Sequence, residues 1–276
     1  MQPHKTLVFA IVALLLATAC SRLTFIKPDL SRKGSSDEIA RPVVLRPDRA
    51  DRRSSQVASA RSHLSASQKF LQAGDDVRAE QEAREALRAD SKSFDAHTLL
   101  AVIEGRRGKS AKSGEHFRRA AELAPANGSV LNNYGAWLCG SGRIAESLGW
   151  FDRALQDRAY ASPASALANA GSCALKSGQA VRAERDSRAA LQLDPGNAVA
   201  LATMAESAFR ANRFFEARAF SERRLAALPP DAGALQLASQ IEMKLGDRVA
   251  ADRYVQRLRA EFPDAGAAYP AGSERR

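Results

Sequence analysis

The chain has 276 residues, of which 45% are hydrophobic and 26% charged, and its net charge at pH 7 is +10. This length suits one folded domain with additional segments. The positive charge is uneven, because residues 21–62 contain ten Lys/Arg and five Asp/Glu, whereas acids and bases alternate in the later part. No basic helix interleaved with aromatic residues appears, which argues against nucleic acid as a partner. The basic segment is better suited to an anionic membrane or glycan surface.

The first twenty residues have the pattern of an export signal. A short basic start precedes an apolar run from Leu7 to Leu16, which is too short to span a membrane and has the length of a signal-peptide core. Small residues then lead to Cys20, as in lipoprotein processing. We therefore predict a lipoprotein signal peptide over residues 1–19 and acylation of Cys20, with ordinary cleavage and secretion as the alternative. Since Ser21 and not Asp follows, the predicted location is the inner leaflet of a bacterial outer membrane, facing the periplasm.

Residues 20–57 are predicted to be a flexible, basic tether. This segment contains Pro28, Pro42 and Pro47 together with many Ser, Arg and Asp residues, and it offers little apolar surface to bury. A flexible chain of this length holds a folded domain tens of ångströms from a lipid surface.

The remaining chain is organised by a spacing of about 34 residues. A turn residue recurs at this interval, with small residues seven positions before it and five after it; the turn positions are Gly74, Gly108, Gly142, Gly178, Asn212 and Gly246. Pro125, Pro195, Pro229 and Pro263 follow four of these positions by 17 residues. A period of this length with two helical patterns is the signature of the tetratricopeptide repeat.

The period predicts an all-α, right-handed superhelical solenoid of about six tetratricopeptide repeats, each an antiparallel helix pair. Small residues allow the two helices to approach closely, and Gly or Asn supplies the left-handed backbone that ends the first helix. One repeat cannot bury its apolar face alone, but a stack buries a continuous core. The predicted domain is 58–265, with repeats at 60–93, 94–127, 128–161, 164–197, 198–231 and 232–265, followed by a disordered tail at 266–276.

The sequence contains none of the common catalytic or cofactor-binding motifs. It has no Gly-x-Ser-x-Gly, no phosphate-binding glycine loop and no zinc-type Cys/His pairing. None of the three histidines His63, His97 and His116 has a partner residue at the spacing that is typical of metal ligands. We therefore expect a binding scaffold and not an enzyme, with no cofactor, no metal site and no small-molecule substrate.

Cys139 and Cys173 lie 34 residues apart, on the first helices of neighbouring repeats. Parallel neighbouring helices can bring two such side chains together, and exported proteins keep disulfides. A disulfide is therefore one reading. The alternative is two buried cysteines acting as small hydrophobic residues.

The binding surface is predicted on the first helices, which line the concave groove of such solenoids. In the first repeat this face carries Leu64, Gln68 and Leu71. In the third repeat it includes Asn132, and the adjacent Asn133 and Tyr134 are unusual in a helix interior. Asn side chains can hydrogen-bond an extended ligand backbone. Alternatively, Asn133 and Tyr134 form their contacts within the repeat stack.

Several stretches resemble the PilF/PilW type IV pilus biogenesis lipoproteins, as do the lipidated Cys, the tether and the six repeats together. These stretches are Val130 to Cys139 (VLNNYGAWLC), Ala168 to Leu175 (ANAGSCAL) and Ile241 to Pro263. The resemblance covers about 200 residues and implies a pilotin, which binds the type IV pilus secretin and supports its outer-membrane localisation and multimerisation. It also implies a secretin contact at Leu64, Phe70 and Leu71. The full set of candidate contacts is Leu64, Gln68, Phe70, Leu71, Asn132, Asn133, Tyr134 and Asn169.

A second function remains open at the level of the sequence. The same scaffold suits a periplasmic adaptor for another outer-membrane assembly or for a cell-wall enzyme complex, in which the basic tether would touch anionic glycan.

Overall fold

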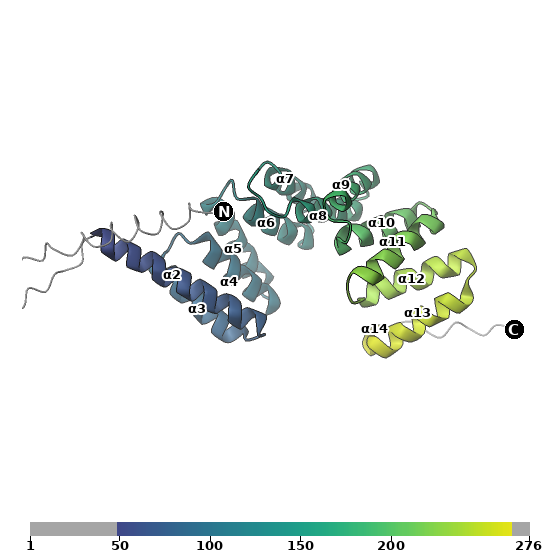
Figure 1. Cartoon of the computed structure of the whole chain (residues 1–276), viewed down its shortest axis with the longest axis horizontal. Helices are drawn as coiled ribbons and strands as arrows, with labels where there is room; N and C mark the ends of the chain where they lie inside the picture. Colours follow the sequence, from purple (N-terminus) through teal and green to yellow (C-terminus); the bar gives the residue numbers. More distant parts are fainter. Residues whose placement is uncertain (1–48, 267–276) are drawn as a thin grey trace, which may run out of the picture. The chain divides into compact units, whose positions relative to one another are not determined.

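The computed structural model describes residues 49–266, which form thirteen helices, and the first twelve of these lie in consecutive antiparallel pairs (Figure 1). No strand occurs within this range. The pairs are α2 (Arg49–Gln72) with α3 (Asp76–Ala89), α4 (Phe94–Arg106) with α5 (Ser110–Leu123), α6 (Gly128–Gly140) with α7 (Ile144–Ala154), α8 (Pro163–Lys176) with α9 (Ala180–Leu193), α10 (Ala198–Arg210) with α11 (Phe214–Ala227), and α12 (Ala232–Leu245) with α13 (Arg248–Glu261). The short helix α14 (Pro263–Gly266) follows the last pair.

The turn inside each pair contains one residue in the left-handed backbone region. Five of these residues are glycines, with φ between 73° and 80° in the first four pairs and 83° at Gly246. The fifth pair uses Asn212, with φ of 57°. Asn tolerates this conformation better than other residues with a side chain, so the first helix ends one or two residues before the left-handed position in all six pairs.

The first residues of many helices are fixed by side-chain caps. The side chains of Ser93, Asn127, Asn197 and Asp231 each accept a hydrogen bond from the backbone N–H three residues later. Such caps satisfy helix donors that have no partner inside the helix. Four of the first helices therefore begin at defined residues, which sets the register between repeats.

Close approach of the two helices in a pair depends on small residues at the crossing point. The buried Ser67 and Ser113 hydroxyls donate to the backbone oxygens of the facing helix, with Oγ–O distances of 2.8 and 2.7 Å. At Gly135 a Cβ atom would lie 2.9 Å from the ring of Phe151, so no side chain fits there. The crossing residues explain why the spacing of small residues predicts the fold.

The all-α architecture of six helix pairs confirms the predicted fold class. One boundary differs from the prediction, because α2 begins at Arg49, so that residues 49–57 of the predicted tether are helical. After Pro47 the sequence has no further Gly or Pro until Gly74, so the packed part of α2 extends outward without a breaker. The signal peptide, Cys20, the tether before residue 49 and residues 267–276 lie outside the described residues.

Candidate protein-interaction site

The candidate contacts in the first repeat divide into one exposed residue and three partly buried ones. Gln68 is exposed on α2. Leu64, Phe70 and Leu71 pack against a buried cluster that includes Leu100 from α4. These three side chains therefore help to join the first two repeats, and only part of their surface is available to a partner.

Two of the candidate asparagines bond each other across neighbouring repeats. The Asn169 Nδ2 group on α8 donates to Asn132 Oδ1 on α6, with a distance of 3.0 Å. Asn132 is only 8% exposed, so its amide is largely withdrawn from solvent. Asn133 is partly buried on the same helix. The Asn132–Asn169 pair thus fixes α6 against α8, and little of it is left for a ligand.

Tyr134 belongs to the core and not to the groove. Its side chain is buried, and its ring lies 6.0 Å from that of Trp137 and 4.8 Å from that of Trp150, measured between centroids. The guanidinium of Arg153 sits 4.2 Å from the Trp150 ring centre. The contacts of Tyr134 are therefore made inside the repeat stack, which agrees with the alternative stated above for this residue.

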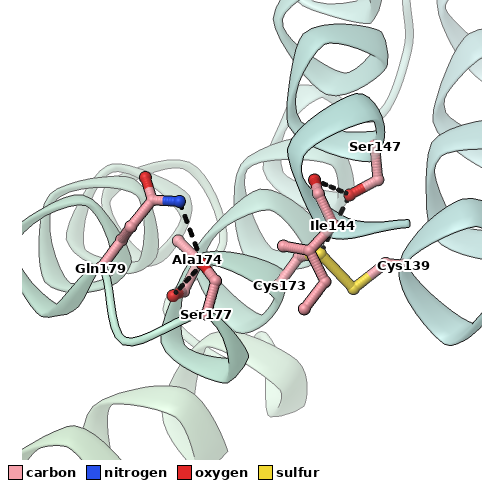
Figure 2. The surroundings of a disulfide bond; sticks show 7 residues. All are labelled: Cys139, Ile144, Ser147, Cys173, Ala174, Ser177 and Gln179. Carbon is pink, nitrogen blue, oxygen red and sulfur yellow. Dashed lines mark hydrogen bonds between the residues drawn. A yellow bond between two sulfur atoms is a disulfide. The ribbon is translucent and has the colours of Figure 1, made fainter. Parts of the chain in front are cut away.

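Cys139 on α6 and Cys173 on α8 form a disulfide, with a Cα–Cα distance of 5.9 Å (Figure 2). The Ser147 hydroxyl lies 3.0 Å from Cys173 Sγ and also donates to the backbone oxygen of Ile144 at 2.7 Å. Together with the asparagine pair, the disulfide gives α6 and α8 two specific links. Among the described residues, the third and fourth repeats are the neighbours that a disulfide joins.

A histidine pair that sequence reasoning missed lies in the second repeat. The Nδ1 atoms of His97 on α4 and His116 on α5 are 3.0 Å apart. Burial lowers the pKa of His97, and the charges of His116 and Arg119 lower it further. Burial also lowers the pKa of His116, against an opposing effect of the Glu104 carboxylate. Both rings therefore favour the neutral form more than free histidine does.

A groove that sequence reasoning missed lies between α8, α10 and the segment joining α11 to α12. We call it the C-terminal groove; it has a volume of about 440 Å³ and its apolar lining includes Leu175, Val199, Ala202 and Leu228. Sequence reasoning compared the first and third repeats and did not examine the corresponding face of the fifth. The available signal was Val199, an apolar residue in the first turn of a first helix.

Neither a metal site nor a membrane-spanning helix emerges from residues 49–266. No group of three or more His, Cys, Asp or Glu side chains there could hold a metal ion. Similarly, none of the helices in this range combines the length and apolar character needed to cross a membrane.

The helix pairs and their crossings can now be compared with known proteins. Residues 174–241 match the family model of the tetratricopeptide repeat. The crystal structure of PilW, described as a widely conserved type IV pilus biogenesis factor, superimposes with a TM-score of 0.69 and 29% sequence identity, over 76% of this chain and 97% of PilW. The chain is a tetratricopeptide-repeat relative of PilW.

The relationship extends to PilF. The type IV pilus assembly protein PilF of Pseudomonas aeruginosa is 26% identical over 194 residues, which cover 70% of this chain and 77% of PilF. A Pseudomonas aeruginosa PilF structure has a TM-score of 0.68 and 24% identity, covering 78% of this chain and 98% of PilF, and it shows the shared fold. The chain is therefore similar to type IV pilus tetratricopeptide proteins along most of its length.

Proposed function

We propose that this protein is an outer-membrane lipoprotein that binds the type IV pilus secretin and promotes its localisation and multimerisation. The main support is the similarity to PilW, a type IV pilus biogenesis factor, which extends over 97% of that protein and 76% of this chain. Repeat scaffolds of this kind work through protein–protein contacts along an extended surface.

The proposed mechanism is tethered recruitment. An acyl anchor at Cys20 would hold the protein at the outer membrane, and the repeats would carry a secretin subunit with it. Confining both proteins to one membrane raises their effective concentration, so that a modest affinity suffices for assembly.

The first repeat offers Gln68 as its most accessible candidate contact. A double change of Leu64 and Leu71 to Asp would test binding poorly, because both side chains pack against the core and the charges would also destabilise the fold. Gln68→Arg avoids this problem, since the residue is exposed and Arg is a good helix former. Gln192→Arg on α9 is the matched control, because Gln192 is likewise exposed within a helix.

The decisive experiment is deletion of the gene, followed by unheated gels of outer-membrane fractions probed for the type IV pilus secretin. We expect the multimer to be lost or mislocated, and to be restored by the wild-type protein and by Gln192→Arg. Poor restoration by Gln68→Arg would assign the contact to the first repeat. Normal secretin multimers in the deletion strain would refute the proposal and favour an adaptor for another assembly.

The anchor has its own test. Cys20→Ser should release the protein from the outer-membrane fraction into the soluble periplasmic one, with the wild-type protein as the control. If the variant still fractionates with the outer membrane, acylation of Cys20 is not what holds the protein there.

A further inference from the structure

The C-terminal groove has an apolar floor that the repeat stack leaves exposed. Val199 is 43% exposed and Leu228 is 55% exposed, and both line this groove. Ala202 lies between longer side chains and keeps the floor open. The volume of about 440 Å³ lies in the range of about 300–1,000 Å³ that is usual for ligand sites. The site is therefore large enough for one or two bulky apolar side chains of a partner.

Charges at the edges of the groove are paired, with one exception. Arg210 Nε lies 2.7 Å from Glu206 Oε1, and Arg224 Nη2 lies 2.9 Å from Asp231 Oδ2. Lys176 is exposed at the end of α8, and no carboxylate among the described residues forms an ion pair with it. The groove thus offers one free positive charge next to an apolar floor.

The segments of this chain outside the described residues do not complement that charge. Residues 1–48 contain seven Lys/Arg and four Asp/Glu, and residues 267–276 contain two Arg and one Glu. Both segments are therefore net positive, so neither as a whole offers charge complementarity to Lys176. Charge complementarity favours a segment from another protein that brings a carboxylate.

We propose that the C-terminal groove binds an extended segment of a partner protein in which an acidic side chain is flanked by bulky apolar ones. The apolar side chains lie on Val199 and Leu228, and the carboxylate pairs with Lys176. This site is separate from the candidate contacts of the first repeat, and the proposal holds whether or not the partner is the secretin.

The probe is an array of octapeptides whose positions are drawn from Leu, Val, Phe, Asp, Lys and Ser, incubated with the full-length chain. We expect the retained peptides to be enriched in Asp together with Leu, Val or Phe. Retention of Lys-rich peptides, retention without apolar residues, or no retention above background would overturn the proposal.

Two pairs of variants locate the binding, measured by fluorescence anisotropy of the best retained peptide. Val199→Asp and Lys176→Glu should each weaken binding at least tenfold. The matched controls are Val249→Asp, which makes the same change at the second residue of α13, and Lys244→Glu, which alters the corresponding exposed lysine of α12. An acid in the first turn of a helix is compatible with folding, so Val199→Asp should retain the wild-type melting temperature within a few degrees.

The outcomes of the variant series are distinct. If the controls weaken binding as much as the groove variants, the peptide binds elsewhere and the proposal fails. If the wild-type protein is dimeric by size-exclusion chromatography and Val199→Asp makes it monomeric, the occupant is a second copy of this chain, which also refutes the proposal.

Discussion

Two Gly→Ala substitutions should change stability in opposite directions, although both lie inside helices. At Gly149 on α7 an added Cβ meets nothing within 4 Å. At Gly171 on α8 the same atom would lie 2.5 Å from Ser187 Oγ and 3.0 Å from the backbone oxygen of Ala183. A backbone atom cannot turn away as a flexible side chain does, so the second substitution must push α8 and α9 apart.

The size of the difference follows from two effects. Ala is favoured over Gly inside a helix by about 0.5–1 kcal/mol, and this gain applies equally at Gly149 and Gly171. Overpacking costs about 1–3 kcal/mol and applies only at Gly171. The free energies of unfolding of the two variants should therefore differ by about 1–3 kcal/mol. For a fold of this size that corresponds to a difference in melting temperature of about 2–12 °C.

Thermal unfolding followed by circular dichroism tests this prediction. Gly149→Ala should melt slightly above the wild-type protein, and Gly171→Ala below it. Adding Ser187→Ala to Gly171→Ala should recover part of the loss, because it removes the nearest atom, and because the Ser187 hydroxyl is buried without a hydrogen-bond partner. A Gly171→Ala melting temperature equal to or above that of Gly149→Ala would refute the close-crossing argument.

Two further predictions concern the disulfide and the histidine pair. Replacing Cys139 and Cys173 by Ser should lower the free energy of unfolding by about 2–4 kcal/mol, because the bond closes a loop of 34 residues; an unchanged denaturant midpoint under oxidising conditions would contradict this. Because the pKa values of His97 and His116 are lowered in the folded state, the unfolded chain binds more protons below about pH 6.5, and stability should fall as the pH is lowered below that value. The double change of both histidines to Asn should reduce this loss, as measured by urea unfolding between pH 5 and pH 8, whereas His63→Asn alone, as a control, should leave it largely intact.

The architecture could be predicted from the sequence because its cause is local and repeated. A residue such as Gly142 or Asn212 ends a helix wherever it occurs, and a small residue such as Gly135 is required wherever two helices cross. Six copies of the same requirement produce a spacing that is visible without any tertiary information. Weak hydrophobicity predicts a flexible tether up to residue 57, whereas α2 begins at Arg49 because a helix anchored at one end can continue into solvent.

The candidate site was harder to predict for a physical reason. In a helix-pair stack the first helix contacts its own partner, the preceding repeat and the following repeat. An apolar residue on it can therefore pack against any of these three neighbours or face the groove. Leu64 on α2 and Tyr134 on α6 lie on helices that also carry groove positions. Leu64 is partly buried against its neighbours, whereas Tyr134 is buried in the core. The C-terminal groove depends on Leu228 and Asp231, which approach α8 and α10 only after the chain has passed through α11. Helical periodicity alone contains no information about that approach.

The disulfide between α6 and α8 also constrains the order of events during maturation. Its two sulfur atoms belong to different repeats, and their Cα atoms come within 5.9 Å only when those repeats are stacked. Stacking of these two repeats therefore brings the two cysteines together and favours their oxidation. Once formed, the bond keeps α6 and α8 covalently linked, so the central repeats can no longer separate fully while the outer ones open and close. Loss of structure should then proceed inward from both ends and reach the third and fourth repeats last.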